Sequence, residues 1–166
     1  VLQKARASAN PLATLISILD KIGGYKEDPL RKKSGLLALI LNQRPEAFLT
    51  FAPGEQVEPV IDYHLMRSCL RVGLVDILDE DLKTKITNRE LISPADEWAI
   101  RLTAYRAIEE VVALSGKSTG AVDWFFFGAR KRCPEMTEPE CSLCQIDSVC
   151  AHRKELFQPV LRTTFY

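Results

Sequence analysis

The sequence lacks a net charge of either sign, a long apolar run and a recognisable secretion signal. Its 166 residues contain 22 lysines and arginines against 22 aspartates and glutamates. This balance excludes a protein that, like a histone, binds nucleic acid through a high positive net charge. A local basic face can still contact phosphates. No apolar run reaches the roughly 18 residues that a membrane helix needs. Because the N-terminus also resembles no signal peptide, we expect a cytoplasmic protein without membrane association.

Composition is otherwise ordinary for a globular protein, with 46% hydrophobic and 27% charged residues. This excludes a disordered tail, a collagen-like fibre and a bare coiled coil. The length fits one domain or two small lobes that share a core. The chain opens at Val1 rather than at methionine, so we expect a fragment or a processed product.

Apolar residues recur at intervals of three and four through most of the chain, a pattern typical of helices with one buried face. Side chains that cap helices well predict helix starts at Asn10, Asp28, Asp62 and Ser93. The expected buried stripe of the longest helix is Trp98, Leu102, Tyr105, Ile108 and Val112. Residues 120–128 are apolar all round, so we expect that helix at the centre of the molecule. The sequence therefore predicts an all-α fold.

Four of the five cysteines crowd into 18 positions with the spacing C-x7-C-x2-C-x5-C: Cys133, Cys141, Cys144 and Cys150. Two disulfides would strain so short a loop, and thiols stay reduced in a protein without a secretion signal. Zinc and a 4Fe-4S cluster both accept four thiolates, but zinc sites usually contain two tight pairs and this loop has one. We therefore expect a 4Fe-4S cluster, with zinc or no metal as alternatives. Cys69 is expected to be a small buried hydrophobe.

Three segments carry a resemblance to a known family: Ile22-Gly23-Gly24 before Arg31-Lys32-Lys33, the run from Val60 to Arg67, and Trp124 to Gly128 leading into the cysteines. Over about residues 12–155 the chain resembles the helix-hairpin-helix base-excision DNA glycosylases. Within them it is most similar to the iron–sulfur branch typified by endonuclease III and the adenine glycosylases. The resemblance implies two helical lobes, here 1–58 and 59–166, with a modified hairpin in the first and the cluster loop in the second.

The resemblance also implies roles for individual residues. Asp62 takes the place of the catalytic aspartate, which stabilises a positively charged sugar and activates water or an amine. The four clustered cysteines hold a structural 4Fe-4S cluster, and the partner is double-stranded DNA in the nucleoid. Contacts to that DNA are expected from the hairpin and from the basic residues before the cysteine loop: Gly23, Gly24, Arg31, Lys32, Arg130 and Lys131.

Two departures from the family pattern affect the site. The first cysteine interval is seven residues rather than six, and the hairpin string L-P-G-V-G-x-K-T-A is absent. The longer connection resembles the expanded hairpin of archaeal 8-oxoguanine glycosylases, in which a K-T pair contains the nucleophilic lysine. Lys33-Ser34 matches that pair, which makes Lys33 the nucleophile, with Lys26 and Lys32 as alternatives. Few residues precede the hairpin, so we expect an N-terminal segment or a partner chain to complete the first lobe.

Each of these residues also has an ordinary structural interpretation. Aspartate is a favoured helix N-cap, and lysines on helices are usually solvated. A lone histidine such as His64 is more often a packing residue than a proton carrier. The aromatic run 124–127 is more often core than a base-stacking platform.

The sequence thus favours a DNA base-excision glycosylase, with or without AP-lyase activity, that flips a damaged or mispaired base out of the duplex. Two alternatives stay open. One is a nucleoside N-glycosidase of the queuosine-salvage type, because a chain with zero net charge suits a small nucleoside substrate better than duplex DNA. The other is a non-catalytic iron–sulfur domain that binds nucleic acid.

Overall fold

The computed structural model describes all 166 residues, and its regular structure consists of helices without a β-strand. The prediction of an all-α fold is therefore confirmed. The helices are α1 (Leu2–Arg6), α2 (Pro11–Leu19), α3 (Lys32–Gln43), α4 (Tyr63–Val72), α5 (Glu80–Asn88), α6 (Pro94–Ser115), α7 (Thr119–Ala129), and the 3-10 turns η1 (Cys141–Leu143) and η2 (Asp147–Val149). None of these helices is both long enough and apolar enough to cross a membrane.

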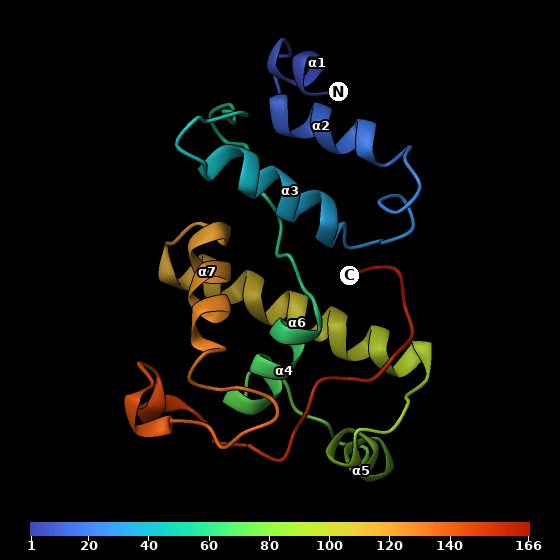
Figure 1. Ribbon diagram of the computed structural model, residues 1–166, viewed down its shortest axis with the longest axis vertical. Helices are drawn as coiled ribbons and strands as arrows, with labels where there is room; N and C mark the ends of the chain where they lie inside the picture. Colours follow the sequence, from blue (N-terminus) through green and yellow to red (C-terminus); the bar gives the residue numbers. More distant parts are fainter.

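The apolar side chains form two separate cores. Nine buried residues between Ala5 and Val60 make the first, and fifteen between Ile61 and Leu156 make the second. Figure 1 shows the corresponding two layers, with α1 to α3 in one and α4 to α7 with the cysteine loop in the other. The chain passes from one core to the other between Val60 and Ile61, immediately before Asp62. Asp62 therefore lies at the junction of the two cores.

Local capping explains where α4 and α6 begin. The Asp62 carboxylate accepts hydrogen bonds from the first free amides of α4, and Ser93 Oγ accepts one from the Asp96 amide of α6. Helix α4 ends at Gly73, whose φ of +92° is a conformation that glycine adopts without strain. Both predicted starts are confirmed.

Helix α3 begins at Lys32, so its predicted start at Asp28 is wrong. The Asp28 carboxylate accepts hydrogen bonds from the Leu30 and Lys32 amides at 3.1 and 2.8 Å. It therefore organises a turn before the helix. Arg31 then adopts a left-handed conformation with a φ of +51°, which separates this turn from α3.

Helix α7 is not central, contrary to the prediction from its apolar sequence. It packs on α4 and α6 through one face, where Val122 and Phe126 are each 6% exposed. Trp124 is 55% exposed and Phe127 is 42% exposed. This outer side is covered only in part, since the Trp124 indole donates to Gln43 Oε1 at the end of α3.

The end of the chain runs back from the cysteine loop towards the first layer, so that its last residues lie between α3 and α6 (Figure 1). The Tyr166 hydroxyl donates to Glu97 Oε1 at 2.6 Å, and the Lys33 ammonium donates to the Thr164 carbonyl. The terminal residues thus contact both layers.

Candidate functional site

Asp62 and Lys32 form an ion pair across the junction of the two cores. Asp62 Oδ1 accepts from the His64 and Leu65 amides at 2.9 and 3.1 Å, which fixes the carboxylate at the N-terminus of α4. Asp62 Oδ2 is left to face Lys32 Nζ at 3.3 Å. The two side chains are 21% and 14% exposed, so solvent still reaches them. This pair joins the first turn of α3 to the start of α4.

A second ion pair, which is buried, fixes the backbone next to Lys32 and Asp62. Arg101 of α6 is fully buried and binds the Asp28 carboxylate through two hydrogen bonds of 2.8 Å. Asp28 also accepts from the Lys32 amide, while Arg101 Nε donates to the carbonyl of Ile61 at 3.1 Å. Because Ile61 directly precedes Asp62, the Arg101–Asp28 pair fixes the backbone on both sides of the site.

Asp123 of α7 is a further acidic group of this site, and sequence analysis missed it. Burial raises its pKa from 3.8 to about 6; the negative charge of Asp62 adds to the rise and Lys32 opposes it. It therefore binds a proton near neutral pH more readily than an ordinary aspartate. The available signal was a single charge within the apolar run Ala121 to Phe127, because an isolated acid in such a run is often buried or functional.

We expect Asp123→Asn to stabilise the protein at pH 7.5 by roughly 1–2 kcal/mol. The folded-state pKa of about 6 lies above the ordinary 3.8, so the folded state holds a proton that the unfolded state has lost between these values. The free energy of unfolding of the native chain should thus fall as pH rises from about 4 to 6. Urea denaturation between pH 4 and 7.5 measures it, with exposed Glu110→Gln as the control. An unchanged pH profile in Asp123→Asn would contradict the assignment.

His64 and Tyr166 border the site without forming part of an acid–base relay. Burial lowers the pKa of His64, an effect that Asp62 opposes, so the ring is neutral at pH 7. Its Nδ1 is buried and has no hydrogen-bond partner. The Tyr63 ring lies 4.2 Å from His64 and 5.9 Å from Tyr166, measured between centroids. His64 therefore packs within an aromatic group beside Asp62.

Lys32 lies next to Asp62, whereas Lys33 contacts backbone carbonyl groups elsewhere. Lys33 Nζ donates to the carbonyls of Gly24 and Thr164, where its ammonium is held by the backbone. Gly23 and Gly24 are exposed, and the Gly24 amide donates to Glu27 Oε2 at 2.8 Å. That amide is thus already occupied. Arg31, at the start of α3, pairs with Asp20 at 2.9 Å.

The four clustered cysteines line one cavity of about 40 Å³ behind α4 and α7. Each cysteine is half-buried, and none forms a disulfide. Cys69 is fully buried elsewhere in α4, where burial raises its thiol pKa to about 12. The four predicted ligands therefore line the same cavity, and the fifth cysteine lies in the core.

A buried cation stands beside this cavity. Arg71 is 3% exposed, and its Nη1 donates to Cys133 Sγ at 3.4 Å and to the Pro134 carbonyl at 2.7 Å. No carboxylate pairs with Arg71, although a buried charge ordinarily needs a partner of opposite sign. The His152 amide donates to Cys150 Sγ at 3.4 Å. These donors suit an anionic group held by thiolates.

The spacing of the sulfur atoms distinguishes two kinds of metal site. A single tetrahedral zinc ion holds its thiolates roughly 3.8 Å apart, given Zn–S bonds of about 2.3 Å. No three cysteine sulfurs lie within 4.8 Å of one another, whereas the ligand atoms of Cys141, Asp147 and His152 do. The four cysteine sulfurs are therefore not arranged around a single zinc ion. The mixed group is a second way in which this loop can bind a metal.

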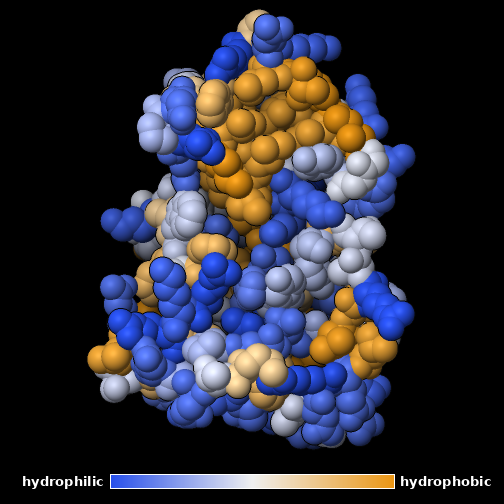
Figure 2. All heavy atoms as spheres, in the orientation of Figure 1, coloured by the Kyte–Doolittle hydropathy of each residue, from blue (hydrophilic) through white to orange (hydrophobic).

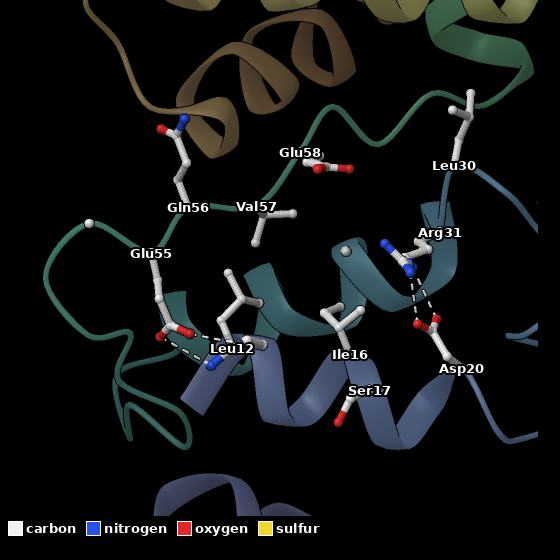
Figure 3. A pocket seen from close by; sticks show the side chains of 13 residues that line it. Leu12, Ile16, Ser17, Asp20, Leu30, Arg31, Glu55, Gln56, Val57 and Glu58 are labelled. Atoms are coloured by element: carbon white, nitrogen blue, oxygen red, sulfur yellow. Dashed lines mark hydrogen bonds and ion pairs between the residues drawn. The ribbon is translucent and has the colours of Figure 1, made fainter. Parts of the chain in front are cut away.

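The largest cavity lies away from these residues. It measures about 480 Å³ between α2, α3 and the segment around Val57. In Figure 3, Leu12, Ile16 and Val57 point into it, Glu55 binds the N-terminus of α2, and the Arg31–Asp20 pair borders its other end. Figure 2 shows a broad apolar surface over the same layer. Neither Asp62 nor Lys32 lines this cavity.

No family model, no curated protein and no solved structure matches this chain.

Proposed function

We propose that the protein is a DNA N-glycosylase that removes a damaged or mispaired base from double-stranded DNA. The observation that carries this proposal is the Lys32–Asp62 ion pair, 3.3 Å long, at the start of α4 and between the two cores. A carboxylate and an amine at one partly open position suit a reaction that develops positive charge on a sugar and needs a nucleophile. The sequence resemblance supplies the class of substrate.

The proposed chemistry assigns one task to each side chain. The Lys32 ammonium first gives up its proton to solvent, and the ionised Asp62 carboxylate then stabilises the cationic sugar as the bond to the base breaks. The neutral Lys32 amine attacks the anomeric carbon, and the base leaves with the bonding electrons. Opening of the sugar then gives a Schiff base, from which strand cleavage follows. The leaving base takes up a proton, and we propose Asp123 as its donor, because a pKa of about 6 keeps this acid partly protonated near neutral pH.

Contacts to the DNA backbone complete the proposal. Arg130 and Lys131 follow α7 and have no carboxylate partner, so they are available to phosphates. Arg31 is half exposed at the start of α3 and exchanges Asp20 for a phosphate in the bound state. This local basic face thus allows the protein to bind phosphates although its net charge is zero.

The four clustered cysteines are proposed to hold a 4Fe-4S cluster, which would tie the loop together and present its basic residues. Arg71 would stabilise the negative charge of the thiolates, since its guanidinium already donates to Cys133. We expect anaerobically purified protein to be brown and to contain about four irons per chain. Cys144→Ser should lose this iron, and Cys69→Ser should retain it. Stoichiometric zinc, or iron that survives Cys144→Ser, would contradict the cluster.

Borohydride trapping on lesion-containing duplexes tests the function and identifies the nucleophile. Sodium borohydride reduces a Schiff base to a stable amine, so a covalent protein–DNA complex should appear on a denaturing gel. Lys32→Ala should abolish it, whereas the matched variant Lys33→Ala should retain at least about half, because Lys33 Nζ is bound to backbone carbonyls. Loss of trapping in Lys33→Ala, with trapping retained in Lys32→Ala, would identify Lys33 as the nucleophile. Base release without trapping would indicate a monofunctional glycosylase.

A nucleoside N-glycosidase is the second candidate, favoured by the zero net charge of the chain. The same two carboxylates and lysine serve this reaction, with a free nucleoside as substrate. Release of base from nucleosides, with none from any duplex, would select this activity. Chromatography of the released base separates the two functions.

A further inference from the structure

Helix α7 presents an exposed aromatic surface made of Trp124, Phe125 and Phe127. Trp124 and Phe127 lie edge to face with centroids 5.5 Å apart. The indole N–H of Trp124 donates to Gln43 Oε1 at the end of α3, which holds the ring in one orientation. Solvated aromatic rings that are fixed in this way provide a ready stacking surface.

A groove of about 380 Å³ runs beside these rings, between α7 and the turn η1. Trp124 and Phe125 line one wall, and Leu143, which is 62% exposed, lies on the other. Gly128 forms part of the wall, and a Cβ added there would meet no atom within 4 Å. The groove can therefore accept a flat ring against the helix.

Positive charge adjoins the aromatic surface on one side. The Arg130 guanidinium lies 3.8 Å from the centroid of the Phe127 ring, and Lys131 follows it. Arg132 pairs with Glu140, whereas neither Arg130 nor Lys131 has a carboxylate partner. Stacking rings beside free cations match bases joined to phosphates. An apolar protein partner would leave these two cations uncompensated at the interface.

We propose that this surface binds unpaired bases of single-stranded DNA, which stack on Trp124 and Phe125 in the groove while Arg130 and Lys131 contact the phosphates. The aromatic groove shares Arg130 and Lys131 with the phosphate contacts of the proposed function, but it includes neither Asp62 nor Lys32, so binding there does not require base removal. It would hold a DNA strand whose bases are unpaired next to the cysteine loop.

Binding of a fluorescein-labelled twelve-nucleotide oligo(dT), followed by anisotropy, tests the proposal. Gly128→Leu fills the groove from an unstrained position, and Phe125→Ala removes a stacking ring that lines it. Each should weaken binding by at least about fivefold. Lys131→Ala should weaken it and lower the slope of log K against log salt by about one. Leu78→Ala, an exposed apolar side chain outside the groove, should bind like the native chain.

A second signal comes from the tryptophans, since the chain has only two. In Trp98→Phe, oligo(dT) should quench the fluorescence of Trp124, because the ring itself stacks. Variants are compared at equal iron content and with matching circular dichroism. The proposal is overturned if Gly128→Leu and Phe125→Ala bind oligo(dT) as tightly as the native chain, or if they weaken binding of a blunt duplex of equal length by the same factor. Self-association through Trp124 without any binding of oligo(dT) would overturn it in favour of a protein partner.

Discussion

Asp62→Asn is expected to reduce base release by about 10²–10³-fold, the usual loss when a group that stabilises transition-state charge is removed. Asparagine caps helices about as well as aspartate, so α4 should keep its start while the charge facing Lys32 is lost. The variant thus separates the chemical role of Asp62 from its structural one. Single-turnover release of base from the preferred duplex measures the effect.

Asp62→Ala provides the matched comparison. It removes both the charge and the cap, so the free energy of unfolding should fall by about a further 1 kcal/mol relative to Asp62→Asn. The His64 and Leu65 amides would then lose their acceptor. If Asp62→Asn keeps more than about half of the activity, Asp62 is a helix cap only and the proposed chemistry is wrong.

Arg101→Leu is expected to lower the free energy of unfolding by about 3–5 kcal/mol, because it leaves the buried Asp28 carboxylate without its counter-ion. Arg101 is fully buried, and Asp28 is 4% exposed, so water cannot replace the lost partner. The Ile61 carbonyl also loses its hydrogen bond. Urea denaturation at pH 7 measures the change.

The double variant Arg101→Leu, Asp28→Asn separates the pair from its surroundings. The substituted asparagine is uncharged and retains an acceptor for the backbone amides, so the double variant should be more stable than Arg101→Leu alone. Surface Arg106→Leu on the same helix should change stability by less than about 0.5 kcal/mol. A loss below about 1 kcal/mol in Arg101→Leu would show that the pair is not buried in solution. Any folded Arg101→Leu protein should also lose activity, since Arg101 fixes the backbone on both sides of the site.

Much of the local structure followed from neighbouring residues. The buried face of α4 contains Leu65, Met66, Cys69 and Leu70, whose spacing of three and four residues is that of a helix with one apolar face. The predicted stripe of α6 is confirmed at Ile108, and Tyr105 and Val112 pack partly buried against the core. The other fully buried residues of α6 were not predicted: Glu97, Ile100, Arg101 and Ala104. Glu97 and Arg101 are polar but have partners elsewhere in the chain, namely Tyr166 and Asp28. Hydrophobic periodicity cannot detect a buried polar residue whose partner is distant in sequence.

The amino-acid sequence by itself determined the all-α class, the caps of α4 and α6, and the four cysteines as one group, because each depends on residues close together in the chain. Only the tertiary structure decided that Lys32 faces Asp62, that Asp123 joins them and that α7 exposes its aromatic side. Adjacent helical residues point about 100° apart, so the packing of α3 against the second layer selects one lysine over the next. Contacts between the two layers join residues that lie far apart in sequence, and no local pattern specifies them.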